Sequence, residues 1–128
     1  MSIETYLHET IGSFVADEQF VRDGIAVVRI IAMLPREPAL RSSWLMACHQ
    51  AEAELLPIVA DRAGRSPRAF EVRLCAAAIM AAIRVVDEEI CSAAVNDGQH
   101  YEQAEATDQL AAAIRAASTL PICDPVGR

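Results

Sequence analysis

Two short stretches of the sequence combine side chains that could do chemistry. The first is Cys48-His49, with Glu52 three residues after His49. All three residue types can bind a metal ion, so this stretch is a candidate metal site. Adjacent residues on a helix point about 100° apart, so Cys48 and His49 cannot easily share one ion. We therefore expect no metal at this stretch and no cofactor in the chain.

The second stretch is Asp87-Glu88-Glu89, with Arg84 one turn before Glu88. General acid–base catalysis needs two carboxylates that face each other in a cleft and have separated pKa values. Consecutive acids on a helix more often form a solvated face, here with an i,i+4 pair between Arg84 and Glu88. The sequence also contains no Ser-His-Asp set, glycine-rich phosphate loop or His-Glu-x-x-His motif. We therefore expect a protein that is not an enzyme.

Four residues could instead line a pocket for a small molecule. Trp44, the only tryptophan, and Cys48 lie one turn apart on the apolar stripe of one expected helix. Arg29 stands within Ala-Val-Val-Arg-Ile-Ile, where one charged donor among apolar side chains could orient a carboxylate or an acyl thioester. Met33 could form a flexible wall for an apolar ligand. The plainer alternatives are core packing for Trp44, Cys48 and Met33, and an arginine that extends into solvent.

Composition indicates one all-helical domain. Of the 128 residues, 53% are hydrophobic but only 5% are aromatic, and alanine recurs throughout. This length suits a single domain with a sizeable core, and the composition favours packed helices over sheets. We place the domain at residues 1–120. Residues 121–128 begin at the helix-ending Pro121 and are expected to form a frayed tail.

Periodicity and punctuation divide the chain into about five helices. Pro57 should kink or split the third helix, because proline removes an intrahelical hydrogen bond. Gly64 should cap that helix in the left-handed conformation, and Ser66-Pro67 should open the fourth. The expected helices run from Ser2 to about Ala16, from Asp17 or Glu18 to just before Pro35, from Pro38 to Gly64, from Pro67 to about Val95, and from Thr107 to Thr119.

The fourth expected helix is apolar on more than one side. One seam repeats hydrophobic residues every three or four positions and includes Ile79, Ile83, Val86 and Ile90. A second face, which begins at Phe70, also lacks charge. A monomer of this size can hardly bury so much apolar surface, so the pattern favours a homodimer.

Charge and segment lengths limit the partners. The net charge is −7, with eleven arginines and no lysine, so the surface should repel phosphate backbones, and we expect no direct nucleic-acid binding. The N-terminus carries no secretory signal, and the longest uncharged apolar run, Leu74 to Ile83, is too short to cross a bilayer. We expect a cytoplasmic protein without membrane contact. Its four cysteines lack a Cys-x-x-Cys pair and should be buried free thiols.

Several segments resemble the C-terminal domain of TetR-type transcription regulators. Within that family, the chain is most similar to members grouped with the mycofactocin-system regulator. The resemblance implies an effector pocket among the first three helices, and a dimer interface in which the last two helices form a four-helix bundle. It rests on Pro38-Ala39-Leu40-Arg41, Trp44-Leu45, Glu54-Leu55-Leu56, Ala63-Gly64-Arg65-Ser66-Pro67 and Val72-Arg73-Leu74-Cys75-Ala76-Ala77-Ala78.

Together these observations predict a ligand-sensing and dimerisation domain. Its effector should be a small apolar or amphipathic molecule, for example of acyl type, in a pocket lined by Arg29, Met33, Trp44 and Cys48. No helix-turn-helix pattern of the family precedes Ser2, so we do not assign operator binding to this chain. The alternative is a helical dimerisation or interaction module that lacks the DNA-binding head of the family and binds no small-molecule ligand. The expected dimer-interface residues are Ile79, Ile83, Val86, Ile90, Leu110 and Ile114.

Overall fold

A computed structural model describes residues 2, 5, 8–9, 18–99 and 102–117 of the chain. Residues 18–99 and 102–117 contain no strand, which confirms the predicted all-α fold. The first expected helix falls mostly outside the described residues, and the expected tail at 121–128 falls wholly outside them. The elements are α2 (Glu18–Met33), the short 3-10 helix η1 (Leu34–Arg36), α3 (Pro38–Ala63), α4 (Phe70–Asn96) and α5 (Gln103–Ala117).

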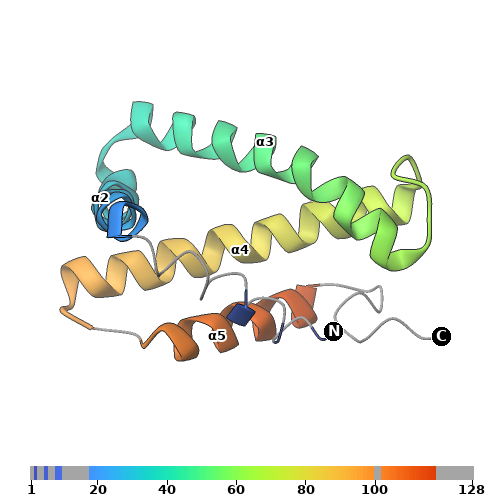
Figure 1. Cartoon of the computed structure of the whole chain (residues 1–128). Coiled ribbons are helices and arrows are strands. Elements are labelled where there is room, and N and C mark those ends of the chain that lie inside the picture. The colour runs from blue at the N-terminus through green and yellow to red at the C-terminus, as the bar shows by residue number, and fades with distance from the viewer. Residues whose placement is uncertain (1, 3–4, 6–7, 10–17, 100–101, 118–128) are drawn as a thin grey trace.

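Three of the helices form an antiparallel stack. Figure 1 shows α3, α4 and α5 one above another, each running opposite to its neighbour. Helix α2 is seen end-on, beside the start of α3 and the final turns of α4, so it crosses the stack at that end. The packing between helices is therefore α3 on α4, α4 on α5, and α2 on α4.

Helix α3 follows its sequence signals closely. It begins at Pro38 and continues through Pro57 without a split, while Figure 1 shows its axis bending toward α4 in its second half. Pro57 is exposed, so water can satisfy the carbonyl that proline leaves without a donor. Gly64 ends the helix at φ 63°, and the N–H of Arg65 donates to the carbonyl of Ala60.

The start of α4 corrects one expectation. The helix was expected to open at Pro67, but it begins at Phe70. The N–H of Ala69 donates to the carbonyl of Ser66 at 3.0 Å, which closes a β-turn with Pro67 at its second position. Proline favours that position because its φ is already suitable, so Ser66-Pro67 builds a turn before the helix rather than its first turn.

The end of α4 lies where it was predicted, whereas α5 begins earlier than expected. Asn96-Asp97-Gly98 ends α4 as predicted, with Gly98 at φ 65° and the N–H of Gln99 bonded to the carbonyl of Ala93. Helix α5 begins at Gln103, four residues before the expected Thr107. Helix-favouring alanine and glutamate residues between these positions extend it backward.

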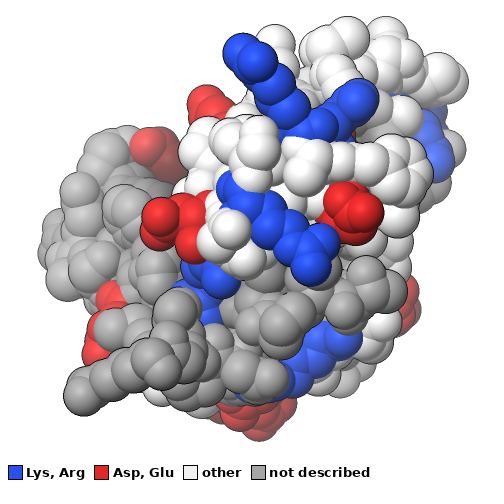
Figure 2. All heavy atoms as spheres, turned by 90° about the vertical axis from the view of Figure 1, so that its right-hand side faces the viewer, with Lys and Arg blue, Asp and Glu red and all other residues white. Residues whose placement is uncertain are grey.

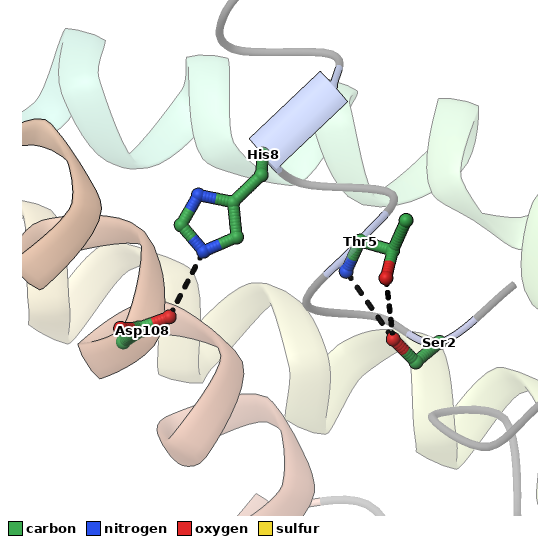
Figure 3. A network of polar contacts seen from close by, with 4 residues as sticks. All are labelled: Ser2, Thr5, His8 and Asp108. Atoms are coloured by element: carbon green, nitrogen blue, oxygen red, sulfur yellow. Dashed lines mark hydrogen bonds and ion pairs between the residues drawn. The ribbon is translucent and has the colours of Figure 1, made fainter.

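Polar contacts link the beginning of the chain to α5. In Figure 3, Nε2 of His8 lies 3.0 Å from Oδ1 of Asp108 on α5. Nearby, the hydroxyls of Ser2 and Thr5 lie 3.0 Å apart, and the N–H of Thr5 donates to Oγ of Ser2. These contacts are exposed, so they contribute little to stability.

Two apolar clusters hold the helices together. The larger cluster joins α3, α4 and α5 and is centred on Val72, which is completely buried, and Val59, which is 1% exposed. The smaller cluster joins α2, η1, α3 and α4, and its buried members are Ile31, Leu34 and Cys91. The first cluster stabilises the stack, and the second attaches α2 across its end.

Candidate functional site

A polar network connects the facing sides of α3 and α4. Nε1 of Trp44 donates a hydrogen bond of 3.1 Å to Oε1 of Glu88. Nη1 of Arg84 donates to both oxygens of the same carboxylate, at 3.3 and 3.0 Å. The sequence predicted the Arg84–Glu88 pair but placed it on a solvated face. The two side chains are only 28% and 30% exposed, because α3 lies alongside them.

The indole of Trp44 lies at the crossing of three helices. Besides its bond to Glu88, it packs against the smaller apolar cluster, whose buried members Ile31, Leu34 and Cys91 come from α2, η1 and α4. Its polar edge therefore contacts α4 while its apolar body supports α2. A change in the position of Trp44 would therefore alter the contacts of α2, α3 and α4.

Next to the network lies a shallow groove of about 180 Å³ between α3 and α4. Arg84 lies at this groove, so the network supplies a cation to a mostly apolar depression. The buried thiol of Cys48 also faces it. The remaining lining residues are Leu45, His49, Glu52, Ala77, Met80 and Ala81.

A second and smaller hollow of about 90 Å³ lies at the corner between α2, η1 and α3. Glu88 lines this hollow together with Arg41, Ser92 and apolar residues of α2 and η1. The Arg84–Glu88 pair therefore contributes its cation to the groove and its anion to the corner hollow.

Burial perturbs the titratable groups beside the network. Burial and the neighbouring Glu88 raise the pKa of Asp87 to about 6. Burial and the charge of Asp87 raise the pKa of Cys91 to about 11. Burial also raises the pKa of Cys48, against the opposing effect of Arg84. This part of the protein therefore favours the neutral form of both thiols, and Asp87 binds a proton more readily than an aspartate side chain in water does.

The structure separates the four predicted pocket residues into two pairs. Cys48 is buried and Trp44 half-buried, both on the face of α3 that meets α4. Arg29 is exposed and Met33 is 48% exposed, both on α2, and neither lines the groove or the corner hollow. Only the pair on α3 is brought to the network.

The predicted dimer-interface residues also divide. Ile79 and Ile114 are each 3% exposed and belong to the larger cluster, and Val86 is 7% exposed. These three are therefore covered within one chain. The remaining three, Ile83, Ile90 and Leu110, are partly exposed.

Arg84 and Glu88 are the site residues that sequence reasoning did not select. Their i,i+4 spacing was visible, but the same spacing occurs on many solvated helices. The informative signal was their setting, since Arg84 follows an uncharged run from Leu74 to Ile83 on a helix that must be buried. A charged pair beside such a run lies close to the buried part of the helix, where each charge needs a partner.

Two properties concern all of the described residues. No group of three or more His, Cys, Asp or Glu side chains there is placed to hold a metal ion. None of the described helices is both long and apolar enough to span a membrane.

Comparison with known proteins identifies the family. Neither the curated proteins nor the solved structures provide a match to this chain. The family described as the MftR C-terminal domain matches residues 13–118, which is most of the sequence. That family groups C-terminal domains of TetR-type transcription regulators, which points to a regulatory role in effector binding and dimerisation. This all-helical chain is therefore a member of the MftR C-terminal domain family of TetR-type regulators.

Proposed function

We propose that this chain senses a small apolar or amphipathic effector at the α3–α4 groove and dimerises through α4 and α5. The Trp44–Glu88–Arg84 network carries the proposal, because it places the guanidinium of a half-buried ion pair at a mostly apolar groove and links that guanidinium, through Glu88, to the indole of Trp44. Sites for small ligands typically combine an apolar lining with a few polar groups that fix orientation.

The groove offers one cation, Arg84, to the head of a ligand, with the acidic Glu52 also in its lining, and an apolar surface to the body of the ligand. Arg84 is its natural head-group contact, because a guanidinium pairs well with a carboxylate. Ala77, Met80 and Leu45 provide the apolar lining for the body. We therefore transfer to Arg84 the anion-binding role that the sequence suggested for Arg29, which is exposed on α2.

Binding at Arg84 would be transmitted through Glu88. A ligand carboxylate would compete with Glu88 for the guanidinium, and Glu88 is also the acceptor for Trp44. Loosening this carboxylate changes the contact between α3 and α4 and the support for α2. Such a ligand would favour one helix arrangement over another, as allosteric control requires.

The first test is Trp44 fluorescence and the thermal midpoint of the purified protein, measured against fatty acids, acyl-CoAs and aromatic drugs. A ligand of the native state should give a saturable fluorescence change and a higher midpoint. Its uncharged alcohol or methyl ester should bind more weakly than the acid, because it lacks the partner for Arg84.

A matched pair of arginine variants tests the site. Arg84→Gln should weaken binding of a responding fatty acid about tenfold or more, because a charge-assisted hydrogen bond is lost. Arg29→Gln should leave the affinity within about twofold. Equal affinities in both variants would show that the ligand does not contact Arg84.

The size of the hollows favours one further candidate, a dimerisation or interaction module without a ligand. Volumes of about 180 and 90 Å³ lie below the roughly 300–1,000 Å³ of typical small-molecule sites. This candidate predicts a stable dimer that responds to no member of the ligand panel. Saturable stabilisation by any one of them contradicts it.

A further inference from the structure

The turn between α3 and α4 carries exposed arginines beside large apolar side chains. Figure 2 looks onto this end of the molecule, where blue arginine side chains project beside a broad white area. Phe70, the first residue of α4, is 70% exposed, and Leu74 in the next turn is 55% exposed. Arg68 and Arg73 flank Phe70 in the sequence and are also exposed. We call Arg68, Phe70, Arg73 and Leu74 the turn patch.

Helical spacing brings members of the turn patch together. Phe70, Arg73 and Leu74 stand at positions i, i+3 and i+4 of α4, which are neighbours on one helix face. Arg68 precedes the helix, and its N–H donates to Oγ of Ser66 at 3.1 Å. The backbone therefore holds an aromatic ring and an aliphatic side chain next to one guanidinium, with a second guanidinium two residues before the helix.

The charges around this turn are of both signs, with arginine in excess. Residues 61–73 contain four arginines and two acidic residues, Asp61 and Glu71, for a net charge of +2. The whole chain carries −7, so the remaining residues carry −9. Within the described part of the chain, the side chains of Arg65, Arg68 and Arg73 form no hydrogen bond or ion pair. The two acidic residues therefore do not pair with these three arginines.

Helix stability accounts for only some of these charges. Glu71 in the first turn of α4 and Arg62 in the last turn of α3 each suit the dipole of their own helix. Arg65 follows the end of α3 and suits that dipole as well. Arg68 and Arg73 lie at the N-terminal end of α4, where positive charge is unfavourable. These two arginines therefore need a reason other than the dipole of α4.

The turn patch has the composition of a protein interface. Aromatic residues and arginine are enriched at the centres of such interfaces and supply much of their binding energy. A guanidinium can pair with a carboxylate through two parallel hydrogen bonds. Phe70 and Leu74 add an apolar contact beside Arg73. The patch therefore suits a partner that surrounds an apolar side chain with carboxylates.

We propose that the turn patch binds an acidic, amphipathic segment of another protein. The apolar side chains of this segment pack on Phe70 and Leu74, and its carboxylates pair with Arg68 and Arg73. None of the residues that line the effector groove belongs to the turn patch. The proposal therefore adds a second binding surface to the proposed function and does not depend on the effector.

The pattern of charges favours a protein segment over DNA or an anionic bilayer. Those surfaces repeat their phosphates at every position, so they would set phosphates against Asp61 and Glu71 as well as against the arginines. They would also face the charge of −9 on the rest of the chain, whose repulsion extends about 8 Å at physiological salt. A short protein segment can place its carboxylates opposite the arginines alone.

Fluorescence anisotropy with two labelled peptides tests the proposal. Both peptides form an amphipathic helix of about five turns with leucines on one face, and the flanks carry glutamates in one peptide and lysines in the other. We expect the full chain to bind the glutamate peptide saturably. Its affinity should exceed that for the lysine peptide by about tenfold or more at about 0.15 M salt.

Matched variants locate the binding surface. Phe70→Ala should weaken binding about tenfold or more, because the apolar anchor is lost. Arg68→Gln combined with Arg73→Gln should weaken it about threefold or more, since exposed ion pairs contribute modestly. The control combines Arg36→Gln with Arg41→Gln, two exposed arginines at the opposite end of α3, and should stay within about twofold of the parent. Circular dichroism should be the same for all variants, because every substituted side chain is exposed.

Each contrary result overturns a defined part of the proposal. The absence of saturable binding, or equal binding of both peptides, overturns the acidic partner. Equal weakening by the control variant overturns the location at the turn patch. Tighter binding of a phosphatidylserine vesicle or a short DNA duplex, lost in the Arg68→Gln and Arg73→Gln variant, overturns the class of partner. Self-association of the chain that is lost in Phe70→Ala identifies a second copy as the occupant instead.

Discussion

The indole N–H of Trp44 and the carboxylate of Glu88 meet at 3.1 Å across the α3–α4 contact, 44 residues apart in sequence. Arg84 approaches the same carboxylate from within α4. Glu88 therefore belongs both to a local helix pair and to a long-range contact. The two roles have different consequences for stability and can be measured separately.

A double-mutant cycle measures the long-range contact. Trp44→Phe keeps an aromatic ring but removes the donor, and Glu88→Ala removes the acceptor. We expect a coupling free energy of about 1 kcal/mol between them in chemical denaturation followed by circular dichroism. The control cycle pairs Trp44→Phe with Glu89→Ala, an exposed neighbour, and should show no coupling beyond about 0.3 kcal/mol. Equal coupling in both cycles would contradict a specific bond.

Asp87 should make stability depend on pH. Its pKa is raised from 3.8 to about 6 by burial and by Glu88, so the folded protein holds this proton more tightly than the unfolded chain. The stabilisation from neutral Asp87 is complete below pH 3.8 and is lost as pH rises through about 6. Asp87→Asn, which cannot ionise, should therefore be more stable than the parent at pH 7.5 by about 1–3 kcal/mol.

The pH profile provides the check for Asp87. The advantage of Asp87→Asn should shrink as pH falls through 6 and vanish near pH 4, in thermal unfolding at several pH values. Glu89→Gln, an exposed control, should stay within about 0.5 kcal/mol of the parent throughout. A variant that is less stable than the parent at pH 7.5 would mean that the Asp87 carboxylate has a stabilising partner.

Two glycines should respond in opposite directions to alanine. Gly64 ends α3 at φ 63° with no atom within 4 Å of an added Cβ, so Gly64→Ala pays for backbone strain alone, about 1 kcal/mol. Gly24 lies inside α2, also in open space, where alanine is the better helix former. Gly24→Ala should stabilise the protein by about 0.5–1 kcal/mol. Thermal unfolding of both variants gives the comparison, and a stabilising Gly64→Ala would exclude the left-handed cap.

Much of the fold follows from local signals in the sequence. Pro38, Gly64 and the Asn96-Asp97-Gly98 segment act through their own backbone preferences, so helix α3 and the end of helix α4 could be predicted without a structure. Ser66-Pro67 was ambiguous, because the same pair suits a helix start and a β-turn. The bond from Ala69 to Ser66 decided for the turn.

Which apolar face of α4 meets which neighbour was decided only by the tertiary structure. The sequence determined that this helix is apolar on several sides, and periodicity alone could not say that Ile79 is buried in the cluster shared with α3 and α5 while Leu74 stays exposed. Similarly, Arg29 and Arg84 each border apolar residues in the sequence. Only Arg84 lies beside a second helix that shields it from water. Helical periodicity records where residues lie around one axis, whereas burial depends on what packs against each side.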